Sequence, residues 1–259
     1  MPAEDRFPAV TNAPPPPPPP DLTPPSDGWY NNPVPMEKIR PVRTVGLVAM
    51  IITGVVVLAS AFITILTPSA ADRARDFLDG VITEDEFVNG YDTIAAAQFV
   101  QSIGTLVAAV TSMVWMFRMA KNVRAFGRST TWAPVFGFVG WFLPPVLVII
   151  PFLMLRELWK ASAPFPTAGE DDWRSGPDLP VLWVWFGLYG VVQTMLFVWQ
   201  ASTLVGAGLS NSAMDLAESI DEAGAISLVS GVTMFASGLA WMVVIRHLNE
   251  RHTVFTNER

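Results

Sequence analysis

Five stretches of this chain contain no charged residue, and each is long enough to cross a lipid bilayer as a helix. They are residues 44–71, 93–117, 129–155, 179–214 and 223–245. A transmembrane helix needs roughly 20 apolar residues to cross a hydrocarbon core of about 30 Å. The chain is 51% hydrophobic and only 15% charged, which fits a protein that is mostly embedded in a membrane. The sequence therefore predicts an all-α integral membrane protein.

The third window differs from the others because four prolines interrupt it: Pro134, Pro144, Pro145 and Pro151. Pro144 and Pro145 remove two amide donors and clash with the preceding turn, so a straight helix through them is costly. Residues 132–143 would form a half-helix of about 18 Å, which reaches only the middle of the membrane. The sequence favours a Pro-broken re-entrant hairpin over 132–159, and a Pro-kinked spanning helix is the alternative.

The distribution of Lys and Arg distinguishes these two topologies. If all five windows span, each side of the membrane holds 8 of the 16 basic residues, which violates the positive-inside rule. If the third window enters and leaves from one face, 14 lie inside and only Arg73 and Arg75 lie outside. We therefore expect four spanning helices, at about 44–66, 94–117, 182–204 and 225–245, with both termini cytoplasmic in a plasma membrane.

The membrane domain, 42–252, lies between two tails, 1–41 and 253–259. The first tail holds 14 of the 23 prolines, including the unbroken run Pro14 to Pro20. Such a run favours an extended polyproline II conformation, and we predict that the tail is disordered. It is either a ligand for an aromatic-lined groove of a partner protein or a solvated spacer.

Four glutamines lie within the predicted spans: Gln98, Gln101, Gln193 and Gln200. Gln98 and Gln101 share one face of the second helix, and Gln193 and Gln200 share one face of the fourth. Buried amides need hydrogen-bond partners in hydrocarbon, so these side chains either join helices or line a polar lane for a solute. In the last span, Gly231 and Gly238 lie seven residues apart, a spacing that lets another helix approach closely.

Three basic residues, Lys121, Arg124 and Arg128, share a helical face just inside the membrane. They are candidates for contact with anionic lipid headgroups, although they could equally serve only to set orientation. The net charge of −7 and the lack of a long basic segment argue against nucleic-acid binding. At the external turn, Thr83 and Glu86 have the spacing of a helix capping box.

No residue pattern indicates catalysis. Cysteine is absent, and no Asp, Glu, Lys or His lies inside a span. A serine hydrolase needs a base beside its nucleophile, and a metal site needs grouped ligands. We therefore expect no enzymatic activity, no cofactor and no metal.

A series of polar and aromatic residues runs from the second helix to the end of the hairpin. It comprises Trp115, Arg118, Asn122, Trp132, Trp141, Pro144, Pro145, Pro151, Arg156, Glu157 and Trp159. This order, together with Arg246, Leu248, Glu250 and Arg251, resembles an uncharacterised membrane domain of high-GC Gram-positive bacteria, domain-of-unknown-function family 4328. The resemblance covers about 44–252 and implies fold and location, not an activity. It singles out these residues as structural or functional candidates, and we expect Arg118 to bind helix-terminal carbonyls or Glu157.

Two readings of function follow. The first is a non-enzymatic scaffold or modulator of membrane partners, and the second is a small transporter or channel subunit with a polar lane near Gln98, Gln101 and Gln193.

Overall fold

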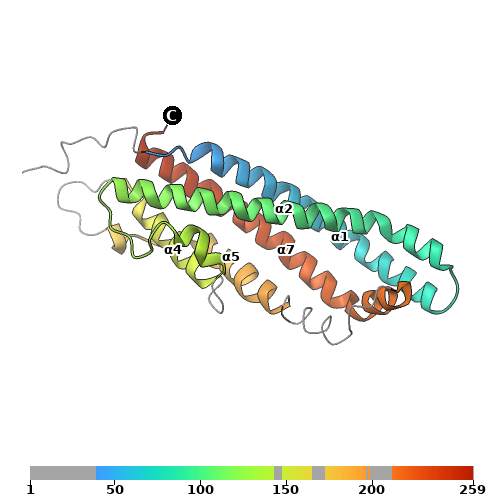
Figure 1. Cartoon of the computed structure of the whole chain (residues 1–259). Helices are drawn as coiled ribbons and strands as arrows, with labels where there is room; N and C mark the ends of the chain where they lie inside the picture. Colours follow the sequence, from blue (N-terminus) through green and yellow to red (C-terminus); the bar gives the residue numbers. More distant parts are fainter. Residues whose placement is uncertain (1–38, 143–147, 165–172, 197, 199–211, 259) are drawn as a thin grey trace, which may run out of the picture. The chain divides into compact units, whose positions relative to one another are not determined.

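Three long helices form the frame of the protein. The computed structural model describes residues 39–142, 148–164, 173–196, 198 and 212–258, and within these it contains helices but no strand. Helices α1 (Arg43–Leu78), α2 (Glu84–Ala125) and α7 (Ala213–Thr256) run side by side (Figure 1). Each is long and apolar enough to cross a membrane. At 1.5 Å per residue they measure about 54 to 66 Å, so they extend well beyond a hydrocarbon core of about 30 Å.

Helices α1 and α7 pack against each other in antiparallel orientation along most of their length. The contact depends on glycines seven residues apart on α7, since a Cβ at Gly231 would overlap Thr64 and one at Gly238 would overlap Val57. At Gly224, seven residues before Gly231, a Cβ would lie 3.6 Å from the Ala71 side chain. Small residues at this spacing let two helix backbones approach closely. The close approach that the sequence predicts for Gly231 and Gly238 is therefore present, and the neighbour is α1.

Helices α1 and α2 form a hairpin whose turn is fixed by local sequence. Gly80 adopts a φ of 73°, which costs glycine little. The Thr83 hydroxyl accepts a hydrogen bond from the Glu86 amide, and the Glu86 carboxylate accepts one from the Thr83 amide at 2.9 Å. The predicted capping box is confirmed, and it begins the 42-residue helix α2.

The described residues of the third window form short helices. After α2 come α3 (Phe136–Val139), a 3₁₀ turn η2 (Gly140–Phe142) and α4 (Ile149–Ala161). Residues 143–147, and with them Pro144 and Pro145, lie outside the described residues. The sequence predicts a half-helix from residue 132, but helix starts only at Phe136 because Pro134 disfavours a helical residue before it.

The segment that follows α4 runs along α7. Helix α5 (Pro180–Trp185) follows the short turn η3 (Trp173–Ser175) and continues into the π-helix η4 (Phe186–Gln193). Described apolar helix runs from Pro180 to Leu196, 17 residues, so the predicted span 182–204 is only partly described. Contacts of Trp185 with Trp241 and of Gln193 with Ser230 make this segment antiparallel to α7.

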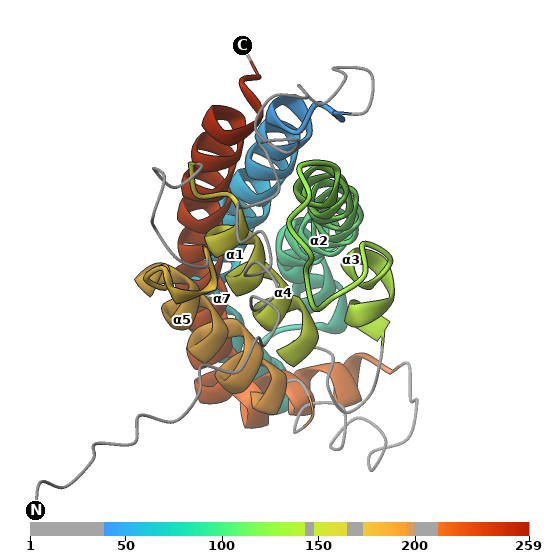
Figure 2. The same ribbon diagram turned by 90° about the vertical axis from the view of Figure 1, so that its left-hand side faces the viewer.

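Most large buried side chains lie at one end of the bundle. We call it the clamp end; it holds the start of α1 and the ends of α2 and α7. Helix α4 lies there between α2 and α7, and α5 lies against α7 (Figure 2). The opposite end, the hairpin end, has a small separate cluster of Ala74, Phe87 and Ala217. The apolar core is therefore concentrated at the clamp end, where segments from the start, middle and end of the chain meet.

Candidate functional site

Buried and partly buried polar side chains gather at the clamp end. We call this group the polar clamp, and it consists of Arg118, Asn122, Arg128, Ser162, Asn249 and His252. These residues come from α2, the loop after it, the end of α4 and the last turns of α7. Two of them, Asn122 and Arg118, bind Arg40 and Pro41, which precede α1 in the chain. The clamp therefore joins segments that are far apart in the sequence.

Asn122 is the centre of the clamp and is fully buried. Its Oδ1 accepts from the Arg40 amide at 2.8 Å, and its Nδ2 donates to the Arg40 carbonyl at 2.9 Å. These two bonds fix the orientation of the amide group. The second Nδ2 proton is directed at His252 Nε2, 3.1 Å away. The imidazole Nε2 must therefore accept a hydrogen bond.

This acceptor role determines the protonation of His252, which is fully buried. If Nε2 accepts, the proton of a neutral imidazole is on Nδ1. Nδ1 lies 2.8 Å from the Ser162 hydroxyl and donates to it. A second proton on the ring would oppose the Asn122 donor. His252 is thus held as one neutral tautomer that connects α2 with the end of α4.

Arg128 caps the end of α4. Its guanidinium donates to the carbonyls of Ala161 at 2.6 Å and Ala163 at 2.7 Å, and only 6% of the residue is exposed. Terminal carbonyls of a helix lack partners within the helix and attract a cation. Arg128 is therefore engaged within the protein instead of being presented to lipid headgroups, because the loop after α2 folds back over α4.

The other two residues of the basic face are partly exposed. Arg124 donates to the Thr130 hydroxyl and carbonyl, and so braces the same loop. Lys121 lies over the Phe117 ring, 4.7 Å from its centre. Of the three predicted lipid contacts, Arg124 is engaged within the protein, and Lys121 remains a candidate.

The start of α1 is held by side chains from distant segments. Arg118 donates to the Pro41 carbonyl at 2.9 Å. The Glu258 carboxylate accepts from the amides of Val42 and Arg43 at 2.9 and 3.0 Å. Arg118 thus binds a carbonyl of the segment before α1, instead of the helix-terminal carbonyls or the Glu157 side chain that the sequence suggests. Free amides at a helix N-terminus favour a carboxylate, which explains the position of Glu258.

Glu157 instead fixes the beginning of the third window. Its two carboxylate oxygens accept from the amides of Thr131 at 2.6 Å and Trp132 at 3.3 Å. Because Glu157 is near the end of α4, residue 131 and the end of α4 are close together. The segment 132–161 therefore begins and ends at the clamp end.

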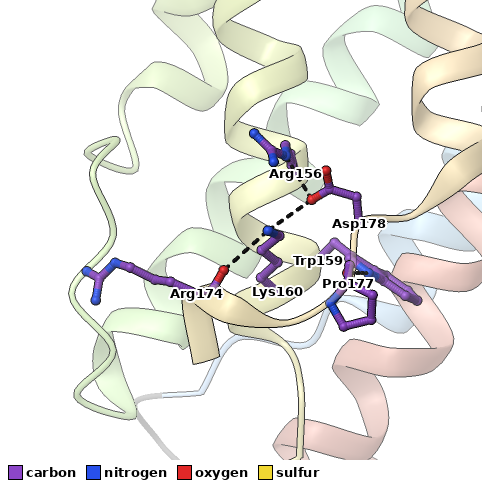
Figure 3. A network of polar contacts seen from close by, with 6 residues as sticks. All are labelled: Arg156, Trp159, Lys160, Arg174, Pro177 and Asp178. Atoms are coloured by element: carbon purple, nitrogen blue, oxygen red, sulfur yellow. Dashed lines mark hydrogen bonds and ion pairs between the residues drawn. The ribbon is translucent and has the colours of Figure 1, made fainter. Parts of the chain in front are cut away.

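A second polar network joins α4 to the start of α5 (Figure 3). Asp178 accepts from Arg156 at 2.8 Å and pairs with Lys160 at 3.0 Å. The indole of Trp159 donates to the Pro177 carbonyl at 3.0 Å. The hydrogen bond from Arg156, with Lys160 nearby, lowers the pKa of the Asp178 carboxyl to about 2. Three of the predicted candidates therefore hold α4 in place. Arg156 and Trp159 do so through this network, and Glu157 does so through its hydrogen bonds with the amides of Thr131 and Trp132.

The remaining aromatic candidates and Pro151 are in or beside the apolar core, whereas Pro144 and Pro145 lie outside the described residues. Trp115 is fully buried, donates to Asn249 at 3.3 Å and packs edge-on against Trp241. Trp132 packs against Phe136, and Trp141 against Trp185. Pro151 is buried in the first turn of α4, where its missing amide proton costs no helical hydrogen bond.

The glutamines of the predicted polar lane bind to other helices. Gln101 donates to the Ser60 hydroxyl of α1 at 2.8 Å. Gln193 donates to the Ser230 hydroxyl of α7 at 3.0 Å. Gln98 accepts from Tyr91 of its own helix at 3.2 Å, in an exposed position. Gln200 lies outside the described residues. The partly buried amides of Gln101 and Gln193 thus act as interhelical ties.

Sequence reasoning missed Ser162, Asn249 and His252. His252 continues the buried stripe of Ile245, Leu248 and Phe255. A histidine at that spacing on an apolar face indicates a buried, hydrogen-bonded ring. The clamp's polar groups bond to one another and to backbone, and among the described residues no group of three or more His, Asp or Glu side chains has the geometry to hold a metal ion. The arrangement is suited to holding segments together.

The fold defines a class: an all-helical protein with three helices able to cross a membrane, closed at one end by a polar clamp. The chain belongs to the family described as Domain of unknown function (DUF4328), whose model matches residues 79–250. The match covers all of the clamp residues except His252 and extends from the start of the α1–α2 turn to the last turns of α7. No curated protein and no solved structure matches the chain.

Proposed function

We propose that this protein crosses the plasma membrane four times and carries a re-entrant hairpin at 132–159, with both termini in the cytoplasm. Both ends of the hairpin segment lie at the clamp end, as the bonds of Glu157 and Arg128 require. In this arrangement the chain crosses once, by way of α5 and η4, before the start of α7 at the hairpin end. The basic clamp end and the acidic hairpin end support the same orientation.

Single cysteines test this topology, since the chain has none of its own. Ser175 is exposed at the clamp end, and Ser212 is exposed where α7 begins. An impermeant thiol reagent applied to intact cells should label Ser212→Cys and leave Ser175→Cys unlabelled until the membrane is opened. External labelling of Ser175→Cys would overturn the re-entrant arrangement.

We further propose that the protein works without chemistry of its own, as a scaffold or modulator of membrane partners. The observation that carries this is the anchorage of the segment between the Pro-rich tail and α1. Asn122 pairs with both backbone groups of Arg40, Arg118 binds Pro41, and Glu258 caps α1. Such anchorage gives the tail a fixed point of departure from the membrane domain, which reduces the entropy that a partner must overcome.

Cross-linking in native membranes with mass spectrometry tests the proposal. The full chain is compared with a variant that lacks residues 1–35 and with a variant in which Pro14–Pro20 are replaced by a Gly/Ser stretch of equal length. We expect both changes to remove the same tail-dependent partner while the melting temperature of the membrane domain stays unchanged. An identical set of cross-linked proteins in all three samples would make the tail a spacer and leave the scaffold role without support.

The alternative is a small transporter or channel subunit with a polar lane near Gln98, Gln101 and Gln193. The ties from Gln101 to Ser60 and from Gln193 to Ser230 favour the scaffold, because both amides are used between helices. Solute flux into proteoliposomes that is abolished by Gln101→Leu, with melting unchanged, would instead favour the transporter.

A further inference from the structure

A cavity lies between the long helices, at the depth of the charge-free windows. The space in it that a water-sized molecule can reach is about 80 Å³, within a wider opening of about 570 Å³ that includes open solvent. Its described lining comes from α1, α2, η2, α5, η4 and α7, and includes Thr105, Ser112, Trp141, Trp185, Tyr189 and Trp241. The glutamines of the proposed lane are absent from that lining. The cavity is therefore separate from the polar clamp and from the interhelical ties.

Aromatic side chains form much of one wall. The rings of Trp185 and Trp241 are 4.7 Å apart and inclined at 32°, and Tyr189 stacks on Trp185 at 5.8 Å and 13°. Trp141 meets Trp185 edge-on at 6.3 Å. Ligand sites are commonly concave and mostly apolar, with a few polar groups that orient the ligand. This wall has that character.

Two buried donors on the lining have no hydrogen-bond partner: the Ser112 hydroxyl and the Trp141 indole N–H. Ser112 is only 2% exposed. Other hydroxyls of these helices bond to their own backbone, as Thr53 does to Ala49 and Thr105 to Gln101. Buried polar groups are nearly always paired, so two unpaired donors beside one cavity indicate a missing acceptor.

The backbone next to the cavity is also unusual. Residues 186–193 form a π-helix, and Tyr189 on this segment faces the cavity. The Thr194 hydroxyl donates to the Tyr189 carbonyl, five residues back. Helical segments of this kind are rare and are often found at functional sites. The widened turn brings the phenol ring into the lining.

We propose that this cavity binds a lipophilic molecule that carries a carbonyl oxygen, with Ser112 and Trp141 as donors to that oxygen and the indole rings around its apolar body. Water alone fits poorly, because a stable buried water needs several polar partners and most of this lining is apolar. The carbonyl could belong to the ester of a bilayer lipid or to a free lipophilic ring ketone or quinone. The two sources present the same chemistry to the donors.

Quenching of tryptophan fluorescence distinguishes the sources. The full-length protein in detergent micelles is titrated in one experiment with 2-methyl-1,4-naphthoquinone and in another with phosphatidylcholine brominated on one acyl chain. Saturable quenching by the first probe identifies a free ring compound, and saturable quenching by the second identifies a membrane lipid. The absence of saturable quenching with both probes would overturn the proposal.

Variants assign the binding to this cavity. Ser112→Ala combined with Trp141→Phe removes both donors and keeps an aromatic ring, although a smaller one, at position 141, and should weaken binding by about tenfold. Thr105→Val is the matched control, because Thr105 lines the cavity but its hydroxyl is already bonded to Gln101. The affinity of Thr105→Val for the quenching probe should remain within about twofold of that of the parent chain.

A second readout separates binding from folding. Removal of an unpaired donor should leave the melting temperature of the ligand-free protein unchanged or raise it, because no hydrogen bond is lost. Ser112→Ala should therefore weaken binding without lowering stability. Equal affinity of the double variant and the parent, or a lower melting temperature of Ser112→Ala without ligand, would contradict the assignment of these donors.

Discussion

The two ends of the bundle are held together in different ways. At the clamp end, large side chains such as Trp115, Met119 and Leu248 are fully buried, and buried polar groups pair with one another. At the hairpin end the buried cluster is small, and the ion pair of Arg75 with Asp221 joins side chains that are 54% and 36% exposed. Burial raises both the gain from a hydrogen bond and the cost of losing one. The clamp end should therefore control the stability of the fold.

The largest effect should come from Asn122→Ala. The change removes the hydrogen-bond partner of the Arg40 amide, the Arg40 carbonyl and His252 Nε2. We expect this to lower the free energy of unfolding by about 3 kcal/mol. We expect the melting temperature in detergent to fall by roughly 5–10 °C. Asn89→Ala is the control, because Asn89 is exposed on the same helix near the hairpin end. Equal melting of the two variants would remove the distinction between the ends.

Gly231→Leu tests the contact that runs between the two ends. A side chain at Gly231 overlaps Thr64 of α1, so α1 and α7 must separate. Overpacking of this kind costs about 1–3 kcal/mol. Gly187→Leu is the matched change, because nothing lies within 4 Å of a Cβ there. Thermal melting should be lowered by the first change and not by the second.

Arg128→Leu and Lys121→Leu separate structural from lipid-facing cations at the clamp end. Loss of the Arg128 cap on α4 should cost about 2 kcal/mol, and Arg128→Lys should restore only part of it because the planar fork is gone. Lys121→Leu should leave melting unchanged and weaken binding to vesicles rich in phosphatidylserine. Unchanged melting together with weaker vesicle binding for Arg128→Leu would instead indicate that Arg128 faces the lipid.

Asp178→Asn should produce a smaller, pH-dependent effect. The pKa of Asp178 is lowered to about 2 in the folded protein, below the ordinary value of about 3.9. The ionised carboxylate therefore stabilises the fold fully above about pH 4, and this contribution is lost as pH falls toward 2. Melting curves across this range should be less pH-dependent for Asp178→Asn than for the parent chain.

The smallest effect should come from Arg75→Ala at the hairpin end. Its pairs with Asp72 and Asp221 are exposed, and such pairs contribute less than about 1 kcal/mol. We expect a change in melting temperature of about 2 °C or less. A loss as large as that of Asn122→Ala would mean that the hairpin end also controls stability.

Several parts of the fold follow from local sequence. The charge-free windows indicate the apolar parts of α1, α2 and α7, because length and hydrophobicity are properties of each segment alone. The Thr83–Glu86 capping box and the glycine spacing of α7 are likewise local patterns, and both are present in the structure. Membership of the family was also readable from the order of Trp115, Arg118 and the residues that follow.

Tertiary structure decided which partner each polar residue found. Arg124 and Arg128 look alike on a helical face, yet only Arg128 is covered, because the loop after α2 folds back over the end of α4. Arg118 contacts Pro41 and not Glu157, since the segment before α1 lies beside Arg118 and Glu157 binds the amides of Thr131 and Trp132. His252 and Ser162 are 90 residues apart and lie 2.8 Å from each other only once α4 has packed against α7. Hydrophobic length acts within one segment, whereas a buried hydrogen bond requires two segments to meet, and the sequence of either segment alone does not specify the other.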